Sequence, residues 1–207
     1  MSDEPVVYIV DDDVAFSESL SVLVSSMGLK TKCFLSPVEY LDQFNPEAPG
    51  VLLLDVRMPK MSGLVLQEKL AAMPICPSII ILTGHAEIPT ALRAMRQGAV
   101  DFLQKTFSES ELYDAIQRGL AQDAKNRAEY RKQQDLTARF SQLNEPEKEV
   151  LQHVLHGVAN KRIASLLGIS RRTVEDRRAR LMQKLEVDSL ADLVRLAVEA
   201  GFHTETP

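Results

Sequence analysis

The sequence predicts two domains of different class: an α/β domain with a doubly wound, five-stranded parallel sheet, then a helical linker and an all-α domain of four helices. Short apolar runs alternate with amphipathic segments in the first part of the chain, whereas the last part shows helical periodicity only. The length of 207 residues suits two domains, since domains cluster near about 100–150 residues. We place the domains at 1–121 and 143–207, with the linker at 122–142.

Five apolar runs are predicted as strands and five amphipathic segments as helices. The central run Val51–Leu54 is apolar without alternation, which is typical of a strand buried on both faces. In such a sheet, ligands bind at the carboxyl ends of the strands. The expected strands are Val6–Val10, Lys30–Phe34, Val51–Asp55, Ser78–Thr83 and Asp101–Gln104, and the expected helices span about 14–27, 36–44, 63–72, 88–97 and 108–121.

The composition is that of an ordinary globular protein, with 45% hydrophobic and 26% charged residues. Cys33 and Cys76 form no CxxC pair, and each lies in or beside an apolar stretch, so we expect two buried free thiols. Neither a signal pattern nor a run of 18 apolar residues is visible, so we expect a cytoplasmic protein without a membrane partner.

Charge is distributed unevenly along the chain. The net charge is −5 overall, but residues 1–123 carry 9 basic and 17 acidic side chains, a net of −8. Within the neutral residues 144–207, the segment 159–184 holds eight basic side chains against two acidic ones. Such a basic stretch in an acidic protein indicates a local binding surface for an anionic partner such as a nucleic acid.

Polar side chains follow four of the predicted strands. Asp11 and Asp12 come after the first strand, Asp55 ends the third, Thr83 ends the fourth and Lys105 follows the fifth. Because the carboxyl ends of parallel strands meet at one edge, these groups are expected to converge. Clustered carboxylates suit a hard divalent cation such as Mg²⁺. An acceptor carboxylate, a metal, a hydroxyl and a cation together favour phosphoryl chemistry.

Five ordered motifs resemble the receiver domains of two-component response regulators, which have a flavodoxin-like fold. The resemblance covers 5–121, through Ile9–Asp13, Leu54–Pro59, Met61–Gly63, Ile81–His85 and Gly98–Lys105. It implies that a sensor histidine kinase phosphorylates Asp55. It also implies that Mg²⁺ or Mn²⁺ is held by Asp12, Asp55 and the backbone carbonyl of Arg57, with Asp11 bound through water.

The same resemblance assigns three further residues and shows one departure. It implies that Thr83 contacts the phosphoryl group, that Lys105 pairs with it, and that Phe102 is the aromatic switch residue. The family usually has Lys-Pro-Phe after the fifth strand, but Thr106 replaces the proline here. Because a cis bond costs about 2.5–4 kcal/mol before a residue other than proline, we expect a trans Lys105–Thr106 bond in the unphosphorylated protein.

The C-terminal pattern favours a helix-turn-helix. If the motif begins at Asn160, Ala164 is the small residue at the helix crossing, Gly168 lies at the turn where positive φ is needed, and Val174 packs the second helix on the first. The segment resembles the LuxR-type domain of FixJ- and NarL-like regulators over about 143–202. The matching stretches are Glu147–Leu151, Asn160–Ala164, Ser170–Glu175, Leu181–Leu185 and Ser189–Val194.

The resemblance implies double-stranded DNA and RNA polymerase as partners. On a helical wheel, Val174, Leu181 and Leu185 face inward, and we expect Arg178 to pair with Glu175. Lys161 and Lys184 are predicted phosphate contacts. The carboxylate of Asp176 suits a cytosine amino group. The full predicted DNA-binding set is Lys161, Arg172, Thr173, Asp176, Arg177, Ala179, Arg180, Gln183 and Lys184.

Together these patterns predict a transcription regulator in which phosphorylation of Asp55 releases the DNA-binding domain, promotes homodimerisation, or both. Candidate dimer surfaces are Ile88–Gln97 and Ser189–Gly201. We expect no enzyme activity beyond autodephosphorylation. Two other classes stay open: an enzyme with an aspartyl-phosphate intermediate, for which Val56-Arg57 supplies no second acidic group, and a receiver whose tail binds only protein.

Overall fold

The computed structural model describes residues 4–85 and 87–201, so the outermost ends of both predicted domains lie outside the described residues. The chain divides into two compact units, with the division after Ala128. Within the described residues, no helix has the length and apolar character needed to cross a membrane.

The first unit contains the five-stranded parallel sheet that the sequence predicted, and its strand order is β2-β1-β3-β4-β5. In the register of this sheet, Val10 pairs with Leu54, and Asp55 pairs with Leu82. The carboxyl ends of β1, β3 and β4 therefore lie side by side. The strands are β1 (Val6–Val10), β2 (Lys30–Phe34), β3 (Gly50–Asp55), β4 (Ser78–Thr83) and β5 (Asp101–Gln104).

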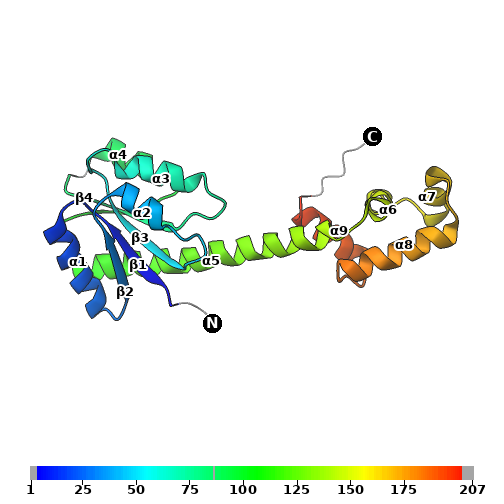
Figure 1. Cartoon of the computed structure of the whole chain (residues 1–207), viewed down its shortest axis with the longest axis horizontal. Coiled ribbons are helices and arrows are strands. Elements are labelled where there is room, and N and C mark those ends of the chain that lie inside the picture. The colour runs from blue at the N-terminus through cyan, green and yellow to red at the C-terminus, as the bar shows by residue number, and fades with distance from the viewer. Residues whose placement is uncertain (1–3, 86, 202–207) are drawn as a thin grey trace. The chain divides into compact units, whose positions relative to one another are not determined.

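Helices cover both faces of this sheet (Figure 1). On one face, α1 (Val14–Ser26) and the first part of α5 (Glu109–Ser141) bury an apolar cluster with alternate residues of the strands. The opposite face packs against α2 (Pro37–Gln43), α3 (Gly63–Ala71) and α4 (Ile88–Arg96). All six residues of β3 are buried, which explains its unbroken apolar sequence. The doubly wound arrangement is confirmed.

Close packing and a buried ion pair attach α5 to the first unit. A Cβ atom at Gly119 would lie 2.6 Å from Cγ2 of Val51, so glycine allows the helix to approach the sheet. Arg127, which is 4% exposed, donates to Asp123 at 2.6 Å and to the carbonyl oxygens of Pro46 and Ala48. The beginning of the predicted linker is thus part of this unit's packing.

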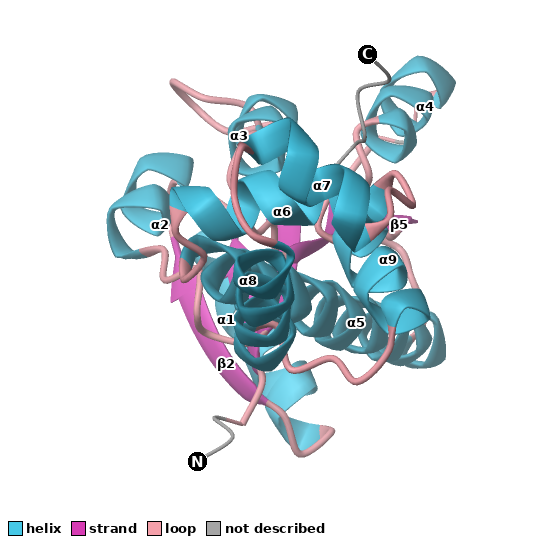
Figure 2. Cartoon of the chain, turned by 90° about the vertical axis from the view of Figure 1, so that its right-hand side faces the viewer, coloured by secondary structure: helices cyan, strands magenta, loops and turns pink. Residues whose placement is uncertain are grey.

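The second unit is built from the last part of α5 and four short helices (Figure 2). Leu136 and Phe140 of α5 are 4% and 5% exposed, and Phe140 belongs to the same apolar cluster as Val174 and Leu181. The predicted linker, 122–142, is helical up to Ser141, where α5 ends, but its side chains contribute to the cores of both units. The four short helices are α6 (Glu145–Leu155), α7 (Asn160–Leu167), α8 (Arg171–Lys184) and α9 (Leu190–Glu199).

The local signals of the helix-turn-helix are present. Gly168 ends α7 with φ at 65°, in the left-handed region that favours glycine. Ser170 then caps α8 by accepting a hydrogen bond from the backbone N–H of Thr173. Ala164 and Val174 are both buried at the contact between α7 and α8. This turn chemistry fixes how α8 follows α7.

The structure tests the predictions for the Lys105–Thr106 bond and for the two cysteines. The described residues contain no cis peptide bond, so the Lys105–Thr106 bond is trans, as predicted. The prediction of two buried thiols is wrong for Cys33, which is exposed because β2 is an edge strand of the sheet. Cys76 is half-buried, and burial, together with the charge of Asp123, raises the pKa of its thiol to about 11.

A buried carboxylate joins α6 to α8. Glu147 is 2% exposed, and its Oε2 accepts from Nζ of Lys184 at 2.6 Å and from the backbone N–H of Asn144 at 3.0 Å. Burial alone would raise the pKa of Glu147, but these two donors outweigh it and lower the pKa. The ionised form is therefore the one that stabilises the fold of this unit.

We predict that Glu147→Gln lowers the free energy of unfolding of the second unit at pH 7 by about 1–2 kcal/mol. This is less than the loss of a fully buried ion pair would cost, because the Lys184 side chain is one-third exposed and water screens the pair. Because the folded pKa of Glu147 is depressed, its contribution is full above the unfolded pKa of about 4.3 and is lost as the pH falls through the folded pKa. Amide hydrogen exchange of α6 and α8 measures this loss of stability. The control Glu145→Gln breaks only an exposed pair with Lys148 and should change exchange little.

Candidate functional site

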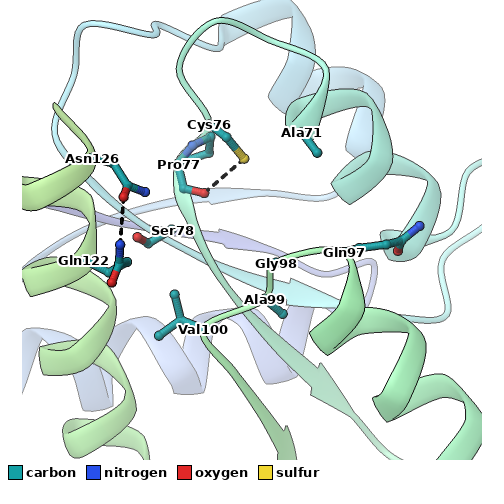
Figure 3. A pocket seen from close by; sticks show the side chains of 10 residues that line it. All are labelled: Ala71, Cys76, Pro77, Ser78, Gln97, Gly98, Ala99, Val100, Gln122 and Asn126. Atoms are coloured by element: carbon teal, nitrogen blue, oxygen red, sulfur yellow. Dashed lines mark hydrogen bonds between the residues drawn. The ribbon is translucent and has the colours of Figure 1, made fainter. Parts of the chain in front are cut away.

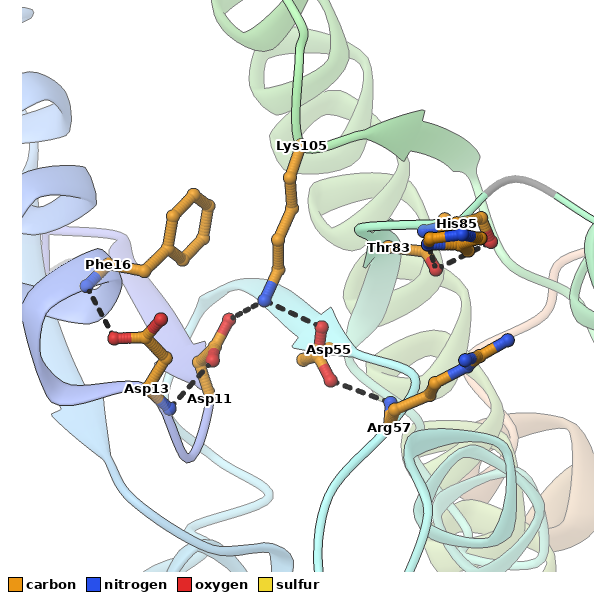
Figure 4. Close-up of polar contacts among 8 residues, drawn as sticks. All are labelled: Asp11, Asp13, Phe16, Asp55, Arg57, Thr83, His85 and Lys105. Carbon is orange, nitrogen blue, oxygen red and sulfur yellow. Dashed lines mark hydrogen bonds and ion pairs between the residues drawn. The ribbon is translucent and has the colours of Figure 1, made fainter.

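The carboxyl edge of the sheet holds one ammonium between two carboxylates (Figure 4). Nζ of Lys105 lies 2.8 Å from Oδ2 of Asp11 and 2.8 Å from Oδ1 of Asp55. Lys105 and Asp11 directly follow β5 and β1, and Asp55 is the last residue of β3, so the strand order brings the three together as the sequence predicted. The second oxygen of each carboxylate accepts a backbone N–H, from Asp13 at 3.0 Å and from Arg57 at 2.6 Å.

These groups are largely shielded from water, which strengthens the electrostatic interactions between them. Asp11 is 1% exposed and Asp55 5%. Burial raises the pKa of Asp11, and the nearby charge of Asp55 adds to this increase, although Lys105 opposes it. Burial also acts to lower the pKa of Lys105, but the two carboxylates outweigh it and raise that pKa. One positive charge thus serves two negative ones.

The metal ligands predicted from the sequence are only partly gathered. Asp12 is exposed, and among the residues that the structure describes no three His, Cys, Asp or Glu side chains are arranged to hold a metal ion. The ammonium of Lys105 instead occupies the position between Asp11 and Asp55. The physical reason is that a cation neutralises the buried carboxylates at this point. The oxygen donors themselves are of the kind that Mg²⁺ prefers.

Two loop contacts border this edge. The buried hydroxyl of Thr83 donates to the backbone carbonyl of His85 at 2.9 Å and does not contact Asp55. The exposed guanidinium of Arg57 pairs with Glu87 at 2.7 Å, which links the loop after β3 to the beginning of α4. Both contacts hold the loop after β4 in its present conformation.

Phe102 lies in β5 and is half-buried, where it packs against the apolar cluster of the α3 and α4 face. Its backbone N–H donates to the side chain of Asp101 at 2.8 Å. Its position beside α4 is compatible with the switch role that the sequence suggested.

An exposed polar face runs along α8. Val174, Leu181 and Leu185 are fully buried, so the inward face is as predicted. The opposite face exposes two arginines, one aspartate, one alanine and one glutamine, and Lys161 of α7 is exposed as well. Thr173 and Arg177 are half-buried at the border of this face. The exposed α8 residues are Arg172, Asp176, Ala179, Arg180 and Gln183.

Two residues of α8 have contacts that the sequence did not predict. Lys184, a predicted phosphate contact, bonds to Glu147 and to the carbonyl of Gln142, so its ammonium also has a structural role. Arg178 does not pair with Glu175: its guanidinium donates to Asn160 at 3.2 Å. Glu175 pairs with Arg171 at 2.8 Å. Arg178 therefore has its partner on α7, and Glu175 has its partner on the preceding turn of α8.

Comparison with known proteins decides the family. The model of the response regulator receiver domain matches residues 7–117, and that of the LuxR family of bacterial regulatory proteins matches residues 141–197. The chain belongs to the response regulators, with a receiver followed by a LuxR-type DNA-binding domain.

Curated relatives and solved structures cover nearly the whole regulator. The chain is 44% identical over 193 residues to the response regulator protein TmoT of Ectopseudomonas mendocina, covering 93% of the chain and 88% of the relative. It is 40% identical to the transcriptional regulatory protein FixJ of Azorhizobium caulinodans, covering 94% and 92%. The structure of the response regulator StyR matches with a TM-score of 0.84 and 43% identity, covering 95% of this chain and 99% of that one.

A cavity of about 450 Å³ opens at the other end of the receiver sheet, where β4 begins (Figure 3). It has no charged side chain in its lining and lies away from the acidic edge, where β4 ends. The chemistry of the receiver is therefore expected at the acidic edge and not in this cavity. The lining residues are Ala71, Cys76, Pro77, Ser78, Gln97, Gly98, Ala99, Val100, Gln122 and Asn126.

Sequence analysis missed two contacts around the receiver site. One is the pair between Arg57 and Glu87, and the other is Phe16, whose ring lies beneath the ammonium of Lys105. Nothing in the spacing of Arg57 and Glu87 indicates that their loops meet. The position of Phe16 near the site could have been suspected from the sequence, because the first turn of α1 directly follows the acidic residues at the sheet edge.

We predict that Asp11→Asn raises the unfolding free energy of the unphosphorylated receiver at pH 7, without divalent cations, by up to about 1 kcal/mol. A buried Asp with a raised folded pKa lowers stability above that pKa, and this penalty disappears as the pH falls below the unfolded pKa of about 3.9. Urea unfolding followed by circular dichroism measures the difference. The exposed control Asp12→Asn should leave stability unchanged under the same conditions; a stability loss in Asp11→Asn would contradict the prediction.

Proposed function

We propose that a sensor histidine kinase phosphorylates this response regulator on Asp55 and thereby controls its binding to DNA. The observation that carries the proposal is the buried carboxylate of Asp55 at the sheet edge, 2.8 Å from the ammonium of Lys105 and beside Asp11. An oxygen of this carboxylate would accept the phosphoryl group, forming an acyl phosphate. Lys105 would then pair with the phosphoryl oxygens instead of bridging two carboxylates.

Mg²⁺, or Mn²⁺, is the proposed cofactor of this step. Asp12, Asp55 and the backbone carbonyl of Arg57 would hold it, and Asp11 would bind through water. When bound, the metal neutralises phosphoryl charge during transfer. The donor set fits, since it consists of oxygen atoms next to a buried site with an excess of negative charge. Lys105 must leave Asp11 for that carboxylate to take part.

The proposed response involves Thr83 and Phe102. The Thr83 hydroxyl would exchange its hydrogen bond with the carbonyl of His85 for one with a phosphoryl oxygen. That exchange releases the loop between β4 and α4 and allows Phe102, which packs beside α4, to change its position. The receiver thus converts a new charge into a changed surface. No turnover beyond hydrolysis of its own acyl phosphate is proposed.

The proposed dimer surfaces are two exposed apolar stripes. On α4, Ile88 is 76% exposed, and Leu92 and Met95 follow at helical spacing. On α9, Val198 is 68% exposed and shares its face with Val194. Exposed apolar side chains at such spacing are typical of helix–helix interfaces. Phosphorylation would promote homodimerisation through these faces, release of the DNA-binding domain, or both.

The exposed face of α8 is the proposed reading surface for double-stranded DNA, with the helix in the major groove. Arg172 and Arg180 have the geometry to read guanine, while Asp176 suits a cytosine amino group. Lys161 on α7 would contact phosphate. RNA polymerase is the proposed downstream partner of the bound regulator, which would act in the bacterial cytoplasm.

The phosphorylation proposal predicts one added phosphate per chain upon incubation with acetyl phosphate and Mg²⁺, measured by intact-protein mass spectrometry. Asp55→Asn should abolish it, because the acceptor carboxylate is gone, and Asp12→Ala should slow it at least tenfold through loss of the metal. Asp13→Ala, which removes only the cap of α1, is the control for damage to the same turn. Labelling of Asp55→Asn at the rate of the unmutated protein would refute the assignment.

The DNA proposal predicts different effects for two exposed cations. Arg180→Ala should weaken specific sites more than random DNA, by about 1–3 kcal/mol, since a base contact is lost. Lys161→Ala should weaken both alike and reduce the salt slope by about 0.9, since one phosphate contact is lost. Fluorescence anisotropy over a salt series measures both, with Lys148→Ala on α6, which pairs with Glu145, as control. Equal effects of the two changes on specificity would contradict the division of roles.

A further inference from the structure

An aromatic ring forms the third side of the enclosure around Lys105. Phe16 lies in the first turn of α1 and is half-buried. Nζ of Lys105 lies 4.4 Å from the centroid of its ring, while Asp11 and Asp55 contact the same ammonium from the other sides (Figure 4). A cation over the face of an aromatic ring is attracted by its quadrupole, and more strongly when water is excluded.

A second aromatic contact joins the same helix to the loop that carries Lys105. The ring of Phe16 packs edge-on against the ring of Phe107, with centroids 6.5 Å apart and an interplanar angle of 69°. Phe107 follows Lys105 by two residues, and its N–H donates to the carbonyl of Gln104 at 2.8 Å. Phe16 therefore contacts the loop twice, once at the ammonium and once at Phe107.

We propose that Phe16 is a positioning residue for the phosphorylation of Asp55: its ring holds the ammonium of Lys105 over the carboxylate before the phosphoryl group arrives. This inference rests on the proposed function of Asp55. The family usually has a proline after this lysine, whereas Thr106 stands here, so the orientation of Lys105 depends on other contacts. An aliphatic side chain at position 16 would fill the same space without attracting a cation.

The test compares Phe16→Leu with Phe16→Tyr in the full-length protein. The first readout is the NMR chemical shift of the Lys105 ε-methylene protons, assigned from their absence in Lys105→Arg. A ring face beneath the ammonium shifts these protons upfield; Phe16→Leu should abolish this shift and Phe16→Tyr should retain it. The second readout is the rate of phosphorylation by acetyl phosphate with Mg²⁺. We expect Phe16→Leu to slow it by about threefold to tenfold and Phe16→Tyr by less than about twofold.

A matched control separates positioning from general loss of packing. Phe44→Leu removes another half-buried receiver aromatic, which contacts Tyr40 and not Lys105, and should change neither readout. An unchanged Lys105 shift in Phe16→Leu would overturn the proposal. So would equal slowing by Phe16→Leu and Phe16→Tyr, or by Phe44→Leu. If the unmutated protein takes up no phosphate, the proposed function fails, whereas the chemical shifts still decide whether Phe16 holds Lys105.

Discussion

The receiver depends on one ammonium that is shared by two buried carboxylates. Asp11 and Asp55 come from neighbouring strands, and without a cation their charges would repel one another in a site shielded from water. Lys105 reaches them from the loop after β5 and bonds to both at 2.8 Å. The strand order of the sheet is what makes this possible, because it gathers the ends of the strands at one edge.

Two carboxylates and one ammonium leave a net charge of −1 at this edge of the sheet. A fully neutralised site would have little affinity for a further cation, whereas two carboxylates on one ammonium favour binding of a divalent ion. A phosphoryl group on Asp55 would then redistribute the partners of Lys105 and Thr83. The polar contacts of Thr83 with His85 and of Arg57 with Glu87 border this edge of the sheet.

In the DNA-binding unit, the buried carboxylate of Glu147 has a cation of its own, unlike the two carboxylates of the receiver. Glu147 has a matched cation in Lys184 and a backbone donor in Asn144, so its ionised form is satisfied within the fold. That pairing joins α6 to α8 and helps to set the orientation of the helix whose opposite face is exposed. The charged side chains of Arg172, Asp176 and Arg180 are exposed on that face, where the proposed function has them contact DNA.

The sequence by itself determined the order of elements, the caps and turns, and the meeting of Asp11, Asp55 and Lys105 at the sheet edge. These follow from local properties: apolar periodicity, the cap at Ser170, the positive φ at Gly168, and the position of polar residues directly after strands. A local signal is contained in a few neighbouring residues, so it can be recognised without knowing what packs against them.

Only the tertiary structure decided which side chains found which partners. Lys184 pairs with Glu147 across 37 residues, Phe16 lies under Lys105, and Cys33 is exposed because β2 is the edge of the sheet. Each outcome depends on the distance between elements far apart in the chain. Long side chains such as lysine and arginine have several partners within reach, and the one that is chosen depends on burial and on the packing of whole helices, which residue spacing does not specify.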